Sequence, residues 1–431
     1  MTQNEWGIIP SLRTGLQEIK TVPWSRPWMT IIKKRNQYRH EMKYNFDEIV
    51  QRKHTDCLKY DNLKEMFGTE EVLPMWIADM DFRTPDFIVD AIRNRLSHEL
   101  LGYSYICKRW RPAIQSWVSR RYDWNIETDE IGFVGGIVPA ISFALQCFTK
   151  AGDKVMIQPP VYHPYHHVTH DLDRTLVFNP LKLVDGQLQI DFADFEEKVK
   201  DCKVFLLCNP HNPCGRVWTK EELQHMCDIC VKYNVLVISD EIHCDMALKG
   251  YKHTPFASVS EEAKNCCITF MAASKTFNIA GLKSSYHIIQ NPEIRKQYNE
   301  FLRKSELDTA HVFATGPVAT AYEQGEEWVE QMLEYVEANI DYMEQYLKDN
   351  MPKMGMIRPQ ASFLVFLDAR GLGLPHDKLV EFFIREAKVG MNDGAMFGEE
   401  GSGFMRMNLG CPRSVLEKAL KQIKEAYYKI A

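Results

Sequence analysis

The sequence lacks several features that would place the protein in a membrane or outside the cell. It contains no run of about 18 apolar residues, the length a membrane-spanning helix requires. Its first residues do not show the basic-then-apolar pattern of a secretory signal. The 12 cysteines follow no framework spacing, and several lie inside apolar runs, so we expect reduced thiols. These absences predict a cytoplasmic protein.

A large excess of charge is also absent. The net charge is −6 at pH 7, which gives no indication of nucleic acid or an anionic membrane as a partner. No internal repeat or low-complexity tract is present. With 45% apolar and 26% charged residues, the composition is that of a globular protein, and 431 residues favour two domains over one.

Residues 1–41 differ from the rest of the chain. They carry a charge of +4 and contain Trp6, Trp24 and Trp28, but no sustained helical or strand period. Met42 then opens Met-Lys-Tyr-Asn-Phe-Asp-Glu-Ile-Val, which resembles a natural protein start. We interpret residues 1–41 as an N-terminal extension, either poorly ordered or the product of a misassigned start. A basic arm that binds a partner is the alternative.

Strand-like and helix-like patterns alternate from Gly132 onward. This alternation predicts an α/β fold with a mainly parallel sheet covered on both faces. The last hundred residues change in character and predict a smaller α+β domain. We therefore predict a large domain at 86–325 and a small domain made of 42–85 plus 326–431. The predicted strands lie at 154–158, 175–178, 204–208, 235–239, 267–271, 286–290, 362–367 and 403–409, and long helical patterns lie at 292–305 and 311–350.

Lys275 follows the apolar run Cys267–Met271, so we expect it on a loop at the carboxyl end of a strand. Most lysines are surface residues, and a solvated loop lysine is one interpretation. The other is a nucleophilic amine that forms a Schiff base, as in pyridoxal phosphate enzymes. The local sequence leaves both open.

Three other predicted strands run into residues that can carry chemistry. Asn212 lies in Asn-Pro-His-Asn-Pro-Cys-Gly, Asp240 and His243 in Asp-Glu-Ile-His, and Tyr162 ends Pro-Pro-Val-Tyr. Ligands of open α/β sheets bind at the carboxyl ends of the strands. The sequence therefore predicts that these four side chains surround one cleft with Lys275.

Each of these residues also has a structural interpretation. Asp240 could cap a helix or form an ion pair, or it could hold a ring nitrogen protonated, as an electron sink requires. Asn212 precedes a proline, and Asn-Pro sequences are common in turns, so it could simply be a turn residue. His243 could be structural or could tune a phenolate oxygen. Tyr162 could be packing or could stack on a planar ring.

Two further candidates would bind anions. Gly135, Gly136 and Ile137 open a predicted helix whose backbone N–H groups could bind a phosphate, although a plain turn is the alternative. Arg406 lies in an apolar strand and is costly to bury without an anion. A substrate carboxylate would match its guanidinium, and an internal ion pair is the alternative.

One motif could bind a metal. Cys227 and Cys230 form a Cys-x-x-Cys pair in a helical pattern without a second ligand pair nearby. A zinc site would need further ligands, so packing is the favoured interpretation and no metal site is predicted.

Together these motifs resemble the fold-type I pyridoxal phosphate enzymes, the aspartate aminotransferase superfamily. The resemblance covers essentially all of 42–431. Asn-Pro-His-Asn-Pro-Cys-Gly is similar to the superfamily's Asn-Pro-x-Asn-Pro-x-Gly, and Ser274-Lys275 to its Ser-Lys motif. Pro-Met-Trp-Ile-Ala-Asp-Met-Asp-Phe, Ser-Asp-Glu-Ile-His and Ser-Lys-Thr-Phe-Asn-Ile-Ala-Gly are most similar to the MalY/PatB branch of cystathionine β-lyases, or C–S lyases.

The resemblance implies pyridoxal 5′-phosphate as the cofactor and a role for each matching residue. Lys275 would hold the cofactor and move the Cα proton, and Asp240 would pair with the pyridine nitrogen. Asn212 would bond the 3′ oxygen near His243. Tyr162 would stack on the ring. The residues implied to hold the phosphate are Gly136, Ile137, Ser274 and Lys283.

The resemblance also implies the substrate side of the site. Arg406 would bind the substrate α-carboxylate beside Asn212. Trp76 would lie at the substrate end, although packing of the small domain explains it equally well. Tyr103, in Gly-Tyr-Ser-Tyr, would reach the phosphate of the neighbouring subunit, which implies a homodimer.

The same resemblance implies an α,β-elimination that cleaves cystathionine or related L-cysteine S-conjugates to a thiol, pyruvate and ammonia. Typical aminotransferases carry Tyr three residues after the Asp, where this chain has His243. A class I/II aminotransferase is nevertheless the alternative. A regulatory protein on an aminotransferase fold is a third interpretation, and the retained Lys275, Asp240 and Arg406 weigh against it.

Overall fold

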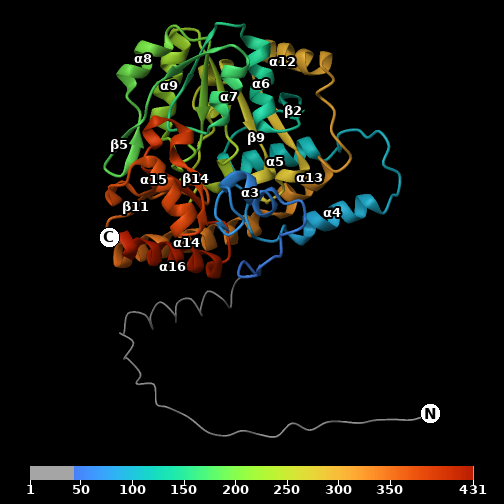
Figure 1. The fold of residues 1–431 in the computed structure, drawn as a ribbon. Coiled ribbons are helices and arrows are strands. Elements are labelled where there is room, and N and C mark those ends of the chain that lie inside the picture. Colours follow the sequence, from blue (N-terminus) through green and yellow to red (C-terminus); the bar gives the residue numbers. More distant parts are fainter. Residues whose placement is uncertain (1–42, 431) are drawn as a thin grey trace, which may run out of the picture. The chain divides into compact units, whose positions relative to one another are not determined.

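The computed structural model describes residues 43–430, so the predicted extension at 1–41 lies outside the described residues (Figure 1). Of these, residues 46–430 form one compact unit. Figure 1 shows a large sheet with α8 (Phe192–Val199) and α9 (Lys220–Lys232) on one side and α6 (Ile137–Phe148) and α12 (Pro292–Lys304) on the other. The predicted α/β fold with a mainly parallel sheet is confirmed.

The large sheet has seven strands in the order β2-β10-β9-β8-β7-β3-β4. Only β10 runs antiparallel to its neighbours. All five residues of β7 and of β9 are buried, as expected for strands covered on both faces. The bounds are Ile131–Val134 (β2), Lys154–Ile157 (β3), Thr175–Phe178 (β4), Val204–Cys208 (β7), Leu236–Asp240 (β8), Cys267–Met271 (β9) and Ser285–Ile288 (β10).

Helices around this sheet begin where the sequence supplies capping groups. Thr219 and Glu222 form a capping box at the start of α9, and the Asn291 side chain accepts from two backbone N–H groups at the start of α12. The inner face of α6 buries Ile137, Ile141 and Leu145 against the sheet. The other helices here are α4 (Asp86–Leu96), α5 (Trp110–Tyr122), α7 (Pro164–Asp171), α10 (Glu261–Asn265), α11 (Ala273–Thr276) and α13 (Gly316–Gln324).

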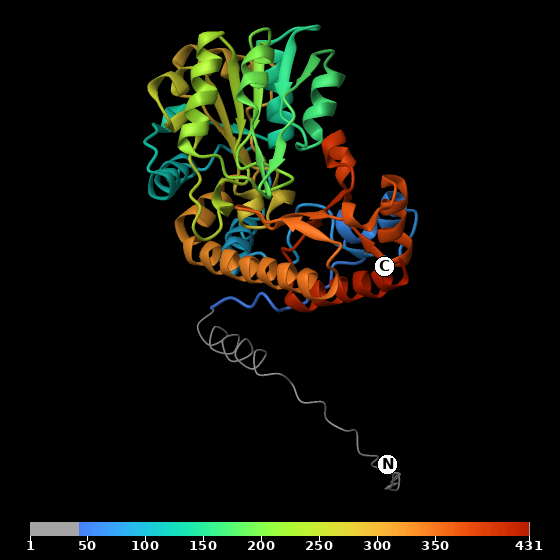
Figure 2. The ribbon, with the colours of Figure 1, turned by 90° about the vertical axis from the view of Figure 1, so that its left-hand side faces the viewer.

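A smaller antiparallel sheet has the order β11-β12-β15-β14. Figures 1 and 2 show α14 (Glu326–Asn350) and α16 (Arg413–Ile430) along the side of this sheet that faces away from the large sheet. The strands are β11 (Gly355–Ile357), β12 (Leu364–Asp368), β14 (Asn392–Asp393) and β15 (Phe404–Asn408). The remaining elements are β1 (Leu73–Pro74), β5 (Lys182–Val184), β6 (Gln187–Gln189), β13 (Val389–Gly390), α2 (Leu58–Asp61), α3 (Leu63–Phe67) and α15 (His376–Glu381).

Two local expectations were wrong. The helical pattern at 311–350 is divided into α13 and α14 at Gly325, where an added Cβ would meet the carbonyl oxygen of Ala321 at 2.4 Å. Lys275 is not on a loop but within the four-residue helix α11, which is too short to leave a periodic pattern. Among residues 43–430, no helix is long and apolar enough to cross a membrane.

Candidate active site

The strand order of the large sheet places the predicted site residues at one edge. Asp240 is the last residue of β8, and its register partners are Cys208 at the end of β7 and Phe270 near the end of β9. Lys275 follows β9, and Asn212 follows β7. The carboxyl ends of neighbouring parallel strands therefore bring the acid, the amide and the lysine to one place.

The amine of Lys275 is enclosed although the residue as a whole is half-buried. Its Nζ donates a hydrogen bond of 2.5 Å to the carbonyl oxygen of Ala78. Burial lowers the pKa of Lys275 to about 8; Asp79 acts in the opposite direction, and Arg406 lowers the pKa further. A solvated loop lysine would not have this environment, so the structure supports the interpretation of Lys275 as a reactive amine.

Asp240 is almost completely buried and is held by two donors. Its Oδ2 accepts from the Tyr165 hydroxyl at 2.8 Å, and its Oδ1 accepts from the backbone N–H of Ile242 at 3.1 Å. Burial raises the pKa of Asp240 to about 6, while these two hydrogen bonds and Lys275 act against the rise. Above that pH the site contains a fixed carboxylate close enough to Lys275 for each group to affect the pKa of the other.

Arg406 is buried and pairs with amides. Its Nη1 donates to Oδ1 of Asn212 at 3.0 Å, and its Nη2 donates to Oδ1 of Asn392 at 2.6 Å. The guanidinium lies over the Phe397 ring, 4.8 Å from the centroid. No carboxylate pairs with Arg406 among residues 43–430, and its Nε has no partner there. Burial lowers the pKa of Arg406 to about 10. A buried cation without a protein anion is ready to bind an anionic ligand.

Two ring side chains complete this side of the site. His243 is buried, and burial lowers its pKa to about 3, with Lys275 and Arg406 acting in the same direction. The imidazole is therefore neutral, and its Nδ1 has no partner among the described residues. Tyr162 packs edge-on against Tyr165, and burial raises the pKa of Tyr162 to about 12, so its hydroxyl stays protonated.

The predicted phosphate residues lie at the start of α6 and beside α11. Gly136 caps α6 with φ +143°, a backbone conformation that side chains rarely adopt. A Cβ added to Gly135 would meet no atom within 4 Å, so the backbone just before the helix is not covered at that position. Ser274 precedes Lys275 in α11, and Lys283, which is exposed, is close enough to lower the pKa of Lys275.

Two predicted residues lie apart from this group. Trp76 is buried against Phe67, with ring centroids 5.6 Å apart, and its Nε1 donates to the Lys59 carbonyl at 3.0 Å. This is the packing arrangement that the sequence left open, and a role at the substrate stays a prediction. Tyr103 is fully exposed, so its predicted contact with a neighbouring subunit is likewise still a prediction.

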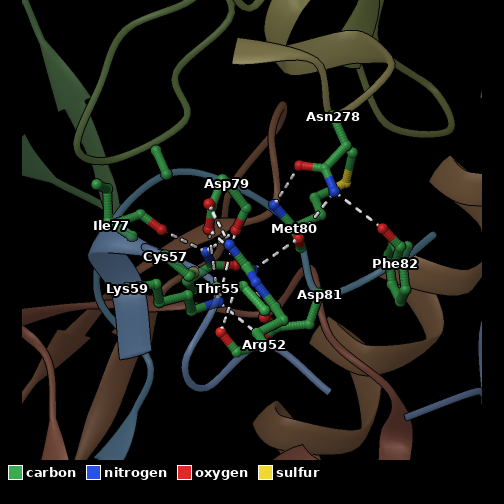
Figure 3. A network of polar contacts seen from close by, with 12 residues as sticks. Arg52, Thr55, Cys57, Lys59, Ile77, Asp79, Met80, Asp81, Phe82 and Asn278 are labelled. Carbon is green, nitrogen blue, oxygen red and sulfur yellow. Dashed lines mark hydrogen bonds and ion pairs between the residues drawn. The ribbon is translucent and has the colours of Figure 1, made fainter. Parts of the chain in front are cut away.

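Several residues in contact with the site were missed by the sequence reasoning. Tyr165 follows Tyr162 in the same strand-end stretch, so its position could have indicated a role. Ala78 and Asp79 lie in the Pro-Met-Trp-Ile-Ala-Asp-Met-Asp-Phe motif, but their approach to Lys275 depends on tertiary packing across almost 200 residues. Figure 3 shows Asp79 within a network of polar contacts that includes Arg52 and Lys59.

Metal binding finds no support in the described residues. No group of three or more His, Cys, Asp or Glu side chains among residues 43–430 could hold a metal ion. Cys227 and Cys230 are both buried in α9, as the packing interpretation expects.

Comparison with known proteins identifies the family. The model of the family described as Aminotransferase class I and II matches residues 70–423. The chain belongs to this family. It is 40% identical over 384 residues to the cystathionine beta-lyase PatB of Bacillus subtilis (strain 168), a match that covers 89% of this chain and 99% of PatB.

Solved structures of family members show the same fold. A PLP-bound putative aminotransferase from Clostridium difficile 630 is 43% identical with a TM-score of 0.88, covering 89% of this chain and 100% of that one. The PLP-bound C-S lyase from Staphylococcus hominis is 34% identical with a TM-score of 0.84, covering 90% and 98%. The predictions of the superfamily and of its fold-type I architecture are confirmed.

Proposed function

We propose that the chain is a pyridoxal phosphate-dependent carbon–sulfur β-lyase. It cleaves cystathionine or related L-cysteine S-conjugates to a thiol, pyruvate and ammonia. The observation that carries the proposal is the similarity to PatB over nearly the whole length of both proteins. This similarity favours the lyase over the aminotransferase alternative. The presence of Lys275, Asp240 and Arg406 in one buried site argues against a purely regulatory protein.

The side chains of the site fit pyridoxal phosphate. The cofactor needs an amine for its aldehyde, a carboxylate for its ring nitrogen and N–H donors for its phosphate. Lys275, Asp240 and the N-terminus of α6 at Gly136 can supply these groups. When bound, the cofactor provides an electron sink for the pair left at the substrate Cα. The residues that would hold it are Tyr162, Asn212, Asp240, His243, Ser274, Lys275, Lys283, Gly136 and Ile137.

Arg406 orients the substrate in this proposal. Its guanidinium binds the α-carboxylate, while Asn212 and Asn392 keep it in place through the two amide contacts. Orientation matters because the bond that breaks at Cα must face the amine of Lys275. The substrate replaces the missing protein anion beside this buried cation.

Lys275 acts as the base that removes the Cα proton. With its pKa lowered to about 8, a large part of the amine is neutral near that pH and can accept the proton. Asp240, with a pKa near 6, is ionised in the same range and keeps the ring nitrogen protonated. The thiolate then leaves from Cβ, and hydrolysis releases pyruvate and ammonia.

The oligomer, the cellular location and the domain division are also part of the proposal. We propose a cytoplasmic homodimer with domains at 86–325 and at 42–85 plus 326–431. Tyr103 and Tyr105 are fully exposed next to exposed Leu100 and Leu101, and an apolar patch of this kind is typical of an interface. In this proposal Tyr103 reaches the phosphate of the neighbouring subunit.

The cofactor and the reaction can be tested on the same preparation. We expect a visible absorbance band that borohydride removes, with the reduced cofactor recovered on the peptide containing Lys275. Lys275→Ala should lack both signals. Turnover of cystathionine should not depend on an added keto acid, whereas an aminotransferase would require one. A colourless protein that stays colourless with added cofactor would contradict the proposal.

A further inference from the structure

The backbone segment of residues 77–82 forms the wall of the site beside Lys275. The Ala78 carbonyl accepts the hydrogen bond from Nζ of Lys275 at 2.5 Å. Asp79, next in the chain, is the charged group with the largest influence on the amine. The position of this short segment therefore decides which acceptor the lysine amine meets.

Asn278 connects segment 77–82 by hydrogen bonds to the turn that follows α11, the helix that contains Lys275. It lies three residues after the lysine, and its Oδ1 accepts from the backbone N–H of Met80 at 2.9 Å. Its Nδ2 donates to the carbonyl oxygens of Met80 and Phe82, both at 2.9 Å. Figure 3 shows these contacts between the Asn278 side chain and the segment.

Asn408 connects the same segment by hydrogen bonds to β15, the strand that contains Arg406. It lies two residues after the arginine at the end of β15. Its Nδ2 donates to the carbonyl oxygens of Ile77 and Asp79, both at 2.7 Å. The side-chain amides of Asn278 and Asn408 thus link one segment to two parts of the site. One part contains the proposed base Lys275, and the other contains Arg406, the proposed carboxylate-binding group.

Ion pairs hold the outer side of the segment. Arg52 contacts Asp79 at 2.5 Å and Asp81 at 2.6 Å, and the fully buried Lys59 contacts Asp81 at 2.7 Å (Figure 3). Two cations thus pair with the two carboxylates of the segment. These ion pairs hold the segment in place beside Lys275.

We propose that Asn278 and Asn408 are positioning residues that hold the Ala78 carbonyl against the amine of Lys275. The inference rests on the proposed function, in which this amine is the base. A neutral amine has two hydrogens and one lone pair at tetrahedral positions. When one hydrogen is donated to Ala78, the lone pair points away from the segment.

The same contact persists through proton transfer. The Cα–H bond breaks, its proton forms a new N–H bond on Lys275, and the electron pair stays with the substrate. The hydrogen bonded to Ala78 is not the one transferred, so the amine keeps its anchor before and after the step. A loosened segment would let the amine turn to other acceptors, and the transfer would slow.

Asn408→Ala and Asn278→Gly test the proposal. Asn278 has φ +56°, which glycine adopts without strain, so this substitution removes the amide and spares the backbone. Asn339→Ala is the matched control. Asn339 is also buried and also donates to two backbone carbonyls, those of Leu409 at 3.0 Å and Cys411 at 2.9 Å, but it makes no hydrogen bond to the segment itself.

The first readout is the titration of Lys275 in the full chain freed of cofactor, followed by acylation and mass spectrometry across pH. We expect both test variants to move the midpoint upward from about 8 toward the ordinary 10.5, because water reaches the amine. Asn339→Ala should leave the midpoint unchanged. An unchanged midpoint in the two test variants, or an equal rise in the control, overturns the proposal.

The second readout uses the loaded enzyme and substrate deuterated at Cα. Because proton transfer becomes slower, kcat should fall about tenfold in the test variants and the isotope effect should increase. The control should stay within about twofold of the parent on both measures. A simple loss of stability would not raise the isotope effect, so an unchanged isotope effect also overturns the proposal. If the parent forms no pyruvate, the proposed function fails, and the titration still decides whether the two amides position the amine.

Discussion

Lys275 and Asp240 show how burial prepares two opposite charges for the same reaction. Burial lowers the pKa of the lysine to about 8 and raises the pKa of the aspartate to about 6. Between these values the carboxylate is ionised while the amine begins to lose its proton as the pH rises. Both groups act in their deprotonated forms, so the proposed lyase should gain activity as the pH rises through about 6 and again through about 8.

Tyr165→Phe tests how Asp240 is kept ionised. The Tyr165 hydroxyl donates to Asp240 and favours its ionised form, so its removal should raise the pKa of Asp240 above about 6. The lower inflection of the kcat/KM profile, near pH 6, should move to higher pH, while the inflection near pH 8 that reports Lys275 stays in place. The pH profile of the variant measures this shift directly.

Tyr298→Phe provides the control for that measurement. The Tyr298 hydroxyl is also buried and donates one hydrogen bond of 2.9 Å, to the Ala140 carbonyl away from Asp240. Its loss should cost about 1 kcal/mol of stability without moving either inflection of the pH profile. An equal shift of the lower inflection in both variants would show that loss of the Tyr165–Asp240 hydrogen bond is not its cause.

At the scale of the elements, apolar runs and strand ends were predictable. Buried strands have continuous apolar sequences, and the predicted bounds of β4, β7 and β9 coincide with those in the structure. Pairs such as β1 with β13 were not predictable, because two-residue strands leave no period and join segments over 300 residues apart. The helix around Lys275 was missed because four residues are too few to leave a period. The break at Gly325 was missed because the helical pattern continues on both sides of it.

The site was predictable only where its residues follow strands. Asp240, Asn212 and Lys275 are adjacent because parallel strands end at one edge. Segment 77–82 enters from a distant part of the chain, and its amide contacts with Asn278 and Asn408 depend on tertiary packing. Single-sequence patterns carry no signal for such contacts.

Gly136→Ala tests the N-terminus of α6 as a phosphate site. Gly136 has φ +143°, and an added Cβ would also lie 3.4 Å from Pro139 Cδ. The strain should destabilise the protein by about 1–3 kcal/mol and weaken cofactor binding by about tenfold, because the helix start moves. Titration with pyridoxal phosphate measures the affinity.

Gly152→Ala is the corresponding control for the backbone strain. Gly152 has φ +84°, no atom lies within 4 Å of an added Cβ, and it lies on the turn that follows α6. We expect a loss of stability of the same order with unchanged cofactor affinity. Equal loss of affinity in both variants would contradict a phosphate site at Gly136.

For the whole molecule, a homodimer would complete the site. Tyr103 stands fully exposed beside exposed leucines, so its side chain is available to a second copy of the chain. Mixed dimers of Tyr103→Ala and Lys275→Ala chains test its proposed reach. Each variant alone should have little activity, but a mixed dimer contains one intact site, so a random mixture should recover about a quarter of the parent activity. Without recovery, Tyr103 would not act across an interface.

Lys275 is proposed to serve an elimination in which a sulfur leaving group departs from Cβ. The most direct measurement follows pyruvate, ammonia and thiol formed from cystathionine over many turnovers, with no keto acid added. We predict equal amounts of all three products, at a rate that Lys275→Ala abolishes. Turnover that occurs only with an added keto acid, and that leaves the carbon–sulfur bond intact, would contradict the proposed elimination.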